Sequence, residues 1–379
     1  MSQQPQRCFE RPPDDVVFDI LNRLPVKSII RFRCVSKSLF STITSPNFIN
    51  KHLHRAKSLS NSNNHNGFLL SKANPVADSS EEDLCTVIYN NDYTLTEICR
   101  FKIPFDDARF LGFCNGIFCF ATYSLRKGFY RNCVGLNGII YLWNPSIRKI
   151  KELLATPLYE VDHGVTLGLA YHSQNNDIKV LRIVCLIGQR VPHIDAEVYT
   201  LSTDSWKRVD VLVESPITRI NQSPCLFFNG ALHSIAYTQS RKFILCFDVN
   251  DEIFREIMLP PHNYLPGLFQ TLERLEVFKG SLALFRFGEG LCQIWVMKEY
   301  GVVESWTEHV VPVENVSQFF GCTGSGELVI TKSIVPHQLF SFDPESRDEN
   351  NLGILDPTPE AYIANFMESL VLLYGRLVI

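Results

Sequence analysis

The sequence of 379 residues contains few of the side-chain patterns that carry out catalysis. Two glycine turns, Gly288-Glu289-Gly290 and Gly324-Ser325-Gly326, are not phosphate loops, because no Lys-Ser/Thr follows either one at the required spacing. Neither a G-x-S-x-G nucleophile elbow nor an H-E-x-x-H zinc motif is present. The ten histidines are scattered, and we expect His52 and His54 to lie on different faces of one helix, at the surface. We therefore predict a protein that is not an enzyme and that needs no cofactor or metal.

The twelve cysteines form no C-x-x-C pair and no Cys/His group at zinc spacing. Most of them lie inside apolar runs, so we expect buried, reduced thiols. The N-terminal residues lack the apolar core of a signal peptide, and no apolar stretch approaches the roughly 18–20 residues of a membrane helix. These features predict no membrane partner and a location in the cytoplasm, the nucleus or both.

Charge divides the chain into two parts. Residues 1–57 hold ten Lys/Arg and four Asp/Glu, a balance of +6, and the remaining 26 basic and 36 acidic residues give −10. The basic part lacks the clustered Arg/Lys with interleaved aromatic residues that nucleic-acid binding favours, so we expect no nucleic-acid partner. The acidic part leads to the hypothesis of a basic target protein. Solubility is the alternative reason for that charge.

The first part of the chain is predicted to be helical. In residues 12–24, PPDDVVFDILNRL, apolar residues recur at i, i+3/i+4 and i+7 spacing, with proline and acids at the start. Three more short helical segments follow, and Ser45 with Pro46 predicts the cap and first turn of the last one. Helices this short make a thin core, so we expect the module to complete its burial against a partner.

The rest of the chain is predicted to be all-β. Residues 58–66, SLSNSNNHN, are polar and low in complexity and predict a linker. From residue 67 onwards, short apolar runs alternate with turn clusters. The four tryptophans fall within or at the starts of these runs, which favours positions in a packed core: Trp143, Trp206, Trp295 and Trp306.

Two sequence elements recur along this β region. The first is an apolar pair, a turn ending in glycine and a strand, as in FCNGIFCF (113–120), FFNGALHSI (227–235) and FKGSLALF (278–285). The second is a strand, a polar turn and another strand, as in YLWNPSIRKIKEL (141–153) and LCFDVNDEIFREIML (245–259). The last copies repeat at roughly 46–50 residues, which is typical of four-stranded propeller blades. With a degenerate first unit at 67–104, the repeats predict a β-propeller of about six blades.

Residues 12–43 resemble the F-box of plant F-box proteins. The pattern of an acidic pair, an apolar helix, Arg-Leu-Pro-Val-Lys-Ser, Arg-Phe-Arg-Cys-Val and Lys-Ser is matched without a gap by Pro13, Asp14, Asp15, Ile20, Leu21, Arg23 to Ser28, Arg31 to Val35, Lys37 and Ser38. Two residues depart from it, since Pro12 replaces the usual leucine and Leu39 replaces the usual tryptophan. The stretches FCNGIFCF, LWNPSIRKI, LGLAYHSQNNDIKVLRI and VYTLSTDSWKRV resemble the F-box-associated or kelch-repeat-like half of the same family. The Gly-Gly doublets of true kelch repeats are missing.

This resemblance implies a small all-α F-box domain at 1–57, a linker at 58–66 and a target-binding β-propeller at 67–379. It further implies the substrate-recognition subunit of an SCF-type ubiquitin ligase, in which the F-box binds a Skp-type adaptor held by a cullin scaffold and the propeller captures a protein for degradation. We expect residues 1–57 to suffice for adaptor binding. The residues expected to contact the adaptor are Pro13, Val17, Ile20, Leu21, Leu24, Pro25, Ile29, Ile30, Phe32 and Val35.

The target and its binding residues are the least determined part of the prediction. Relatives act in pollen–pistil self-incompatibility, defence and other pathways, and the sequence does not choose among them. The candidate target loops are 73–84, 124–138, 188–195 and 260–267, although each could equally be a solvated loop. Within them we expect target contacts from Arg126, Lys127, Tyr130, Arg131, Arg190, His193, His262 and Tyr264. A glycan-binding propeller or a non-degradative scaffold is the alternative function.

Overall fold

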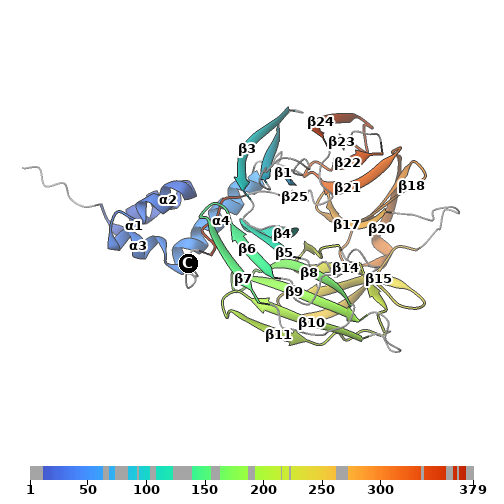
Figure 1. Ribbon diagram of the computed structural model, residues 1–379, viewed down its shortest axis with the longest axis horizontal. Helices are drawn as coiled ribbons and strands as arrows, with labels where there is room; N and C mark the ends of the chain where they lie inside the picture. The colour runs from blue at the N-terminus through green and yellow to red at the C-terminus, as the bar shows by residue number, and fades with distance from the viewer. Residues whose placement is uncertain are drawn as a thin grey trace, which may run out of the picture.

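The computed structural model describes most of the chain: residues 12–62, 68–72, 84–91, 94–102, 108–122, 139–154, 163–186, 193–214, 216–221, 223–261, 272–333, 337–355, 362–364 and 367–372. Side chains are described only for part of these residues, and not for 59–109. A group of helices lies beside a ring of sheets (Figure 1). Among the described residues, no helix is long and apolar enough to cross a bilayer.

Four helices form the N-terminal module: α1 (Asp14–Asn22), α2 (Val26–Phe32), α3 (Lys37–Ile43) and α4 (Pro46–Ser62). The four predicted helical segments are thus confirmed. The Ser36 hydroxyl accepts a hydrogen bond from the Leu39 amide at 3.1 Å, and the predicted Ser45 cap accepts one from the Phe48 amide at 3.2 Å. Helix α4 continues through residues 58–62 of the predicted linker. Once a helix is nucleated, each further residue adds a hydrogen bond at little cost, so a polar composition alone does not end it.

The described strands form six antiparallel sheets, which agrees with the prediction of about six blades. In the order of their strands, the first three sheets are β25 (Tyr362–Ala364), β1 (Phe68–Lys72), β2 (Leu84–Asn91) and β3 (Thr94–Lys102); β4 (Ala108–Cys114), β5 (Ile117–Thr122), β6 (Ile140–Asn144) and β7 (Lys149–Leu153); and β8 (His163–His172), β9 (Asp177–Leu186), β10 (His193–Thr200) and β11 (Ser205–Val209).

The other three sheets continue around the ring. They are β12 (Arg219–Ile220) and β13 (Leu226–Phe228), β14 (Ala231–Tyr237), β15 (Lys242–Asp248) and β16 (Ile253–Met258); β17 (Leu272–Phe278), β18 (Ser281–Gly288), β19 (Leu291–Met297) and β20 (Trp306–Pro312), with the 3-10 helix η1 (Val303–Ser305) before β20; and β21 (Val316–Cys322), β22 (Leu328–Lys332), β23 (Gln338–Phe342) and β24 (Glu349–Leu355).

The ring closes through a pair of strands from opposite ends of the chain. Strand β25 pairs antiparallel with β1, with Leu69 opposite Ile363, so the last strand completes the first sheet. The predicted degenerate unit at 67–104 is therefore three strands of a sheet whose fourth strand comes from the C-terminus. Closure of this kind leaves no sheet of the ring with a missing inner strand.

The recurring sequence elements are the two hairpins of the sheets that follow the first one. Asn115-Gly116 joins β4 to β5 with φ of +52° and +80°, and Asn229-Gly230 joins β13 to β14 with φ of +48° and +75°. Two consecutive positive φ values are the signature of the type I′ turn, which Asn-Gly favours. The second element is the hairpin of the third and fourth strands, as in β6–β7 and β15–β16.

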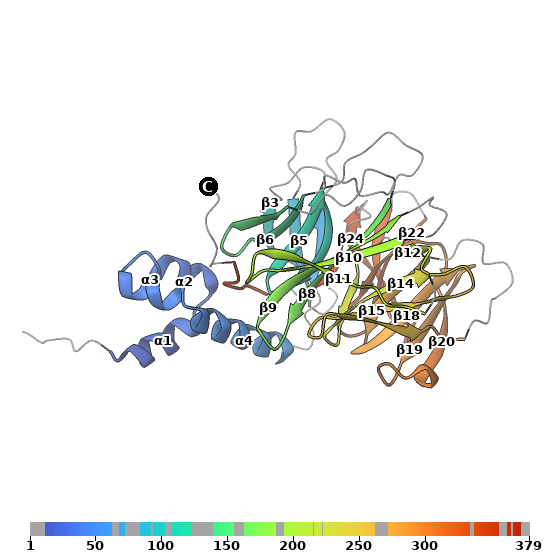
Figure 2. The ribbon, with the colours of Figure 1, turned by 90° about the horizontal axis from the view of Figure 1, so that it is seen from below.

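Strand direction gives the ring two different faces. Because antiparallel strands alternate in direction, the two recurring hairpins of a sheet turn at the same face, which we call the tight-turn face. The second-to-third strand connections and the links between sheets lie at the opposite, long-connection face. Helix α4 reaches the ring beside β8 and β9 (Figure 2).

Neighbouring sheets pack face to face through apolar clusters. One cluster joins Leu142 and Leu153 to Leu167 and Val180 of the next sheet, and similar clusters join the sheets that follow. Three of the four tryptophans, Trp143, Trp295 and Trp306, are buried in the blades as predicted, and Trp206 is half-buried. Among the residues whose side chains are described, eight cysteines are free thiols, and six of these eight are buried.

Strand β8 and the fourth sheet approach each other closely. The inner strand of that sheet is split into β12 and β13, and between them the Cys225 amide donates to the Leu167 carbonyl at 2.8 Å. A Cβ on Gly168 would lie 2.8 Å from the Cβ of Cys225 and 2.9 Å from a methyl of Leu232. Glycine is therefore required at this position by the spacing of the sheets.

We predict that Gly168→Ala lowers the free energy of unfolding of the ring by about 1–3 kcal/mol, since both neighbours are packed. Gly112→Ala is the matched control on the inner strand β4, because its Cβ would lie at an ordinary 3.5 Å from Leu169. We expect the control to change stability by less than about 1 kcal/mol. Urea unfolding followed by tryptophan fluorescence measures both variants. Equal losses would contradict the close approach.

Candidate functional site

The helical module has a small core with one unexpected member. The buried side chains are those of Leu21, Val26, Ile29, Ile43, Phe48, Ile49 and Leu370. Leu370 comes from the end of the chain and not from the helices. The rings of Phe18 and Phe48 pack edge to face at 5.1 Å in the same core.

Exposed apolar side chains concentrate on the first three helices. Among the described residues, twelve large apolar side chains are exposed, and five of them fall between residues 16 and 40: Val16, Ile20, Phe32, Val35 and Phe40. Val16 and Ile20 are four residues apart and share one side of α1. Helices α1–α3 lie together at the end of the molecule away from the ring (Figure 1). Such a concentration marks a surface for protein–protein contact.

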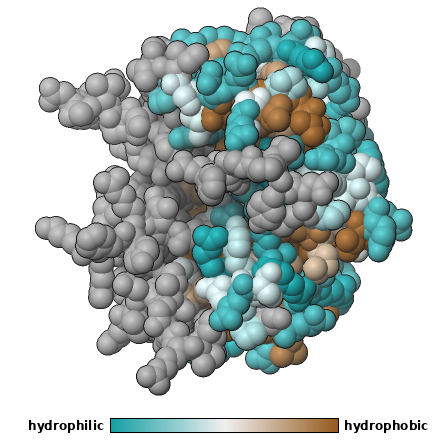
Figure 3. Space-filling view, turned by 90° about the vertical axis from the view of Figure 1, so that its right-hand side faces the viewer, coloured by the Kyte–Doolittle hydropathy of each residue, from teal (hydrophilic) through white to brown (hydrophobic). Residues whose placement is uncertain are grey.

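The ring carries its exposed apolar side chains differently. The other seven are spread over several sheets: Ile150, Leu154, Leu212, Ile253, Met258, Leu272 and Val310. The rim on the side away from the helices is largely hydrophilic, with apolar patches that are separate from one another (Figure 3). Isolated apolar residues of this kind are normal for a soluble surface.

The ten predicted adaptor contacts divide by burial. Pro13, Ile20, Pro25, Phe32 and Val35 are exposed, and Val35 is 69% exposed. Val17, Leu24 and Ile30 are half-buried against the module core, whereas Leu21 and Ile29 lie inside it. The structure adds Val16 and Phe40 to the exposed set. Leu39, at the position of the usual tryptophan, also packs against the core.

The same helical module also carries exposed basic side chains. Arg23, Lys27, Arg31 and Lys37 are all exposed on or beside α1, α2 and α3. They account for much of the +6 balance of residues 1–57. The surface therefore combines apolar anchors with positive charge, which suits an acidic protein partner.

His52 does not lie at the surface as predicted. Its side chain is buried, stacks on Phe48 with ring centroids 6.2 Å apart, and its Nε2 lies 3.3 Å from the Leu24 carbonyl oxygen. Burial lowers the pKa of His52, against the raising effects of that carbonyl and of the Glu368 carboxylate. His54 is exposed, as expected. The prediction failed for His52 because residues distant in sequence complete its surroundings.

The candidate target loops share one face of the ring. The segments 73–84, 124–138, 188–195 and 260–267 connect β1 to β2, β5 to β6, β9 to β10 and β16 to β17. Each of these connections starts and ends at the long-connection face. The predicted target residues Arg126, Lys127, Tyr130, Arg131, Arg190, His262 and Tyr264 lie outside the described residues, and only the backbone of His193, the first residue of β10, is described.

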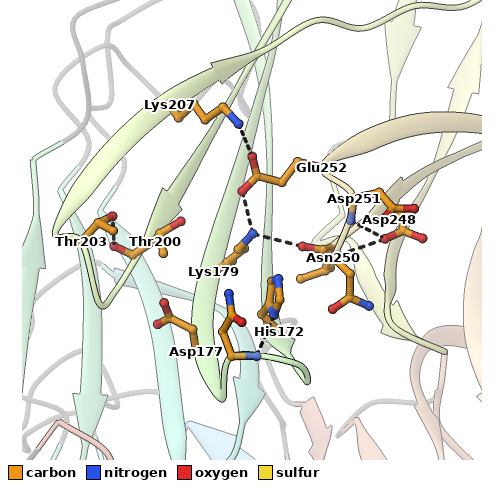
Figure 4. Close-up of polar contacts among 12 residues, drawn as sticks. His172, Asp177, Lys179, Thr200, Thr203, Lys207, Asp248, Asn250, Asp251 and Glu252 are labelled. Atoms are coloured by element: carbon orange, nitrogen blue, oxygen red, sulfur yellow. Dashed lines mark hydrogen bonds and ion pairs between the residues drawn. The ribbon is translucent and has the colours of Figure 1, made fainter.

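A dense polar cluster on the ring holds two sheets together. The Glu252 carboxylate accepts hydrogen bonds from Lys179 and Lys207, each at 2.6 Å, and Lys179 also donates to the Val249 carbonyl at 3.1 Å (Figure 4). Burial raises the pKa of Glu252, but the two ammonium groups outweigh it and hold the pKa below its ordinary value. Each carboxylate oxygen of Glu252 thus accepts a hydrogen bond, and these bonds join β9 and β11 to the β15–β16 turn.

The residues described by the structure contain no group of three or more His, Cys, Asp or Glu side chains that could hold a metal ion. The buried ion pair of Arg182 and Glu197, at 2.7 Å, joins directly opposite residues of β9 and β10. Such pairs fix the register of a sheet and need no ligand.

Sequence reasoning missed one segment that contacts both parts of the molecule, residues 367–372, which we call the C-terminal strap. It follows β25 and contacts both the helical module and the ring. Its residues, MESLVL, carry no motif, and their partners lie more than 200 positions away in the sequence. The hydrophobicity of Leu370, Val371 and Leu372 was the only signal present.

Comparisons with known proteins match both parts of the chain. Residues 13–51 match the F-box domain family, and residues 113–361 match the F-box associated beta propeller domain family. An F-box protein of Arabidopsis thaliana is 31% identical over 79% of this chain and 72% of its own length. An F-box/kelch-repeat protein of the same plant is 26% identical over 78% of each chain. The F-box protein CPR1 of Arabidopsis thaliana is 26% identical over 95% of this chain and 88% of its own.

We predict that the buried and exposed apolar residues between Asp14 and Val35 differ sharply in their effect on stability. Leu21→Ala or Ile29→Ala should lower the free energy of unfolding of the module by about 2–5 kcal/mol, because each leaves a cavity. Ile20→Ser or Val35→Ser should change it by less than about 0.5 kcal/mol, since both side chains are already in solvent. Helical circular dichroism during urea unfolding measures the change. A loss for Val35→Ser as large as that for Ile29→Ala would place Val35 in the core.

Proposed function

The chain belongs to the F-box proteins that carry an F-box associated beta propeller domain, and from this premise we propose that it is the substrate-recognition subunit of an SCF-type ubiquitin ligase. In this role the F-box binds a Skp-type adaptor and, through it, a cullin scaffold. The propeller holds a target protein for ubiquitination and degradation. The chain itself performs no chemical step and acts in the cytoplasm, the nucleus or both.

The observation that carries this proposal is the set of exposed apolar residues on α1–α3. Val16, Ile20, Phe32, Val35 and Phe40 leave apolar area in water on a module of four short helices. Burying that area against the adaptor is favourable at about 25 cal/mol per Å². Arg23, Lys27, Arg31 and Lys37 around it would speed the encounter with an acidic adaptor.

We further propose that the target is bound at the long-connection face. All four candidate target loops belong to it, and the helices contact the ring at the opposite, tight-turn face. The adaptor and the target would then occupy different ends of the molecule and would not compete. The propeller loops differ from one another in length and sequence, which suits a surface that selects one target.

We predict that the double variant Ile20→Ser/Val35→Ser binds a purified Skp-type adaptor at least about tenfold more weakly than the native chain, since each apolar anchor contributes about 1–3 kcal/mol at an interface. Leu212→Ser/Val310→Ser is the matched control, because it removes two exposed apolar residues of similar size from the ring. Isothermal titration calorimetry measures both affinities. Native-like binding by the first variant, or an equal loss in the control, would refute this assignment of the surface.

For the target, we predict an association rate that falls as salt rises. The balance of −10 in residues 58–379 attracts a basic protein over a distance that salt shortens to about 8 Å at physiological ionic strength. The target can be captured from cells with the proteasome inhibited and its binding followed by surface plasmon resonance. A rate that is flat or rises with salt would show that the charge serves solubility alone.

A further inference from the structure

The C-terminal strap belongs to the module core as much as to the ring. Leu370 is only 1% exposed and packs among Leu21, Ile29 and Phe48. The next two residues, Val371 and Leu372, pack instead in the apolar cluster between the second and third sheets. Consecutive residues of one short segment are thus buried in two different cores.

The ring holds the strap by its polar groups. The buried side-chain amide of Asn144 donates to the carbonyl of Ser369 at 3.0 Å, to its hydroxyl at 3.2 Å and to the carbonyl of Val371 at 2.8 Å. The β4–β5 turn closes over the same place, where a Cβ on Gly116 would lie 2.4 Å from the Ser369 hydroxyl oxygen. Both contacts come from the tight-turn face.

The strap also completes the start of α2. This helix begins after Pro25, and no side chain of its own caps it. The Glu368 carboxylate accepts a hydrogen bond from the Val26 amide, the first of the helix, at 3.3 Å. A carboxylate at this position satisfies a free amide and complements the positive end of the helix dipole.

Two further contacts join the module directly to the ring. Ile147, in the β6–β7 turn, packs against both the module core and the ring cluster. The Lys57 ammonium of α4 lies 3.6 Å from the centre of the Tyr171 ring on β8. Together with the strap, these contacts attach the module at the second and third sheets.

We propose that the C-terminal strap is a working part of the F-box module: it closes the module core, completes α2 and holds the adaptor-binding surface in one direction relative to the long-connection face. The helices of residues 12–62 do not close their core without it, so the expectation that residues 1–57 suffice for adaptor binding is replaced by one that includes residues 367–372. The consequence for the adaptor rests on the proposed function, whereas the consequence for the helices does not.

The first test is amide hydrogen exchange on the full chain without adaptor. Leu370→Ala should speed exchange in α1–α4 by at least about thirtyfold, as expected when a buried leucine of the same cooperative unit is lost. Leu153→Ala is the matched control, because it removes a leucine of equal burial from the ring cluster. It should speed exchange in the ring and leave α1–α4 unchanged. Unchanged exchange of the helices in Leu370→Ala would overturn the proposal.

The second test uses two equivalent Asn-Gly turns. Gly116→Ala and Gly230→Ala introduce the same backbone strain. Only the new Cβ at position 116 would clash with Ser369, because the nearest atom to a Cβ on Gly230 is 3.8 Å away. We expect Gly116→Ala to broaden the range of module–ring arrangements seen by small-angle X-ray scattering and to weaken adaptor binding, and Gly230→Ala to do neither. Equal behaviour of the two variants would overturn the role of the strap. If the native chain binds no adaptor, the proposed function fails, while exchange and scattering still decide the role of the strap.

Discussion

The architecture depends on the pairing of β25 with β1. A ring of sheets needs its last strand to complete the first sheet, because an open ring would expose unpaired edges and unpacked faces. Here the pairing runs from Leu70 opposite Tyr362 to Phe68 opposite Ala364. It also brings residues 367–372 to the tight-turn face, where they contact the ring and the helical module. The same pairing thus closes the ring and brings residues 367–372 to the F-box helices.

The two faces of the closed ring differ in structure. The tight-turn face carries the hairpin turns of the sheets, and the helices and the C-terminal strap contact the ring there. The connections at the other face differ in length from sheet to sheet, as is usual for loops that carry binding residues. Direct contacts such as that of Lys57 with Tyr171 attach the helices at the tight-turn face, which is opposite the long-connection face. The proposed function therefore places the adaptor and the target at different ends of the molecule.

Local patterns allowed most of the fold to be predicted. The F-box helices follow from apolar spacing and from caps such as Ser45, and the blades follow from Asn-Gly turns, whose positive φ values are intrinsic to those residues. The partners of β25 and of Leu370 could not be predicted, because they depend on residues some 300 positions away, and no local preference encodes such contacts. The burial of His52 was missed for the same kind of reason. Within the candidate adaptor surface, spacing alone also failed to separate exposed Ile20 from buried Leu21.

In the proposed function, the C-terminal strap holds the adaptor surface and the target surface of one molecule in a fixed relation. The most direct measurement is the structure of the chain bound to a Skp-type adaptor, determined by electron cryomicroscopy. We predict an adaptor in contact with α1–α3, Leu370 inside the module core, and the long-connection face open at the far side. An adaptor seated on the long-connection face, or helices detached from residues 367–372, would contradict this account.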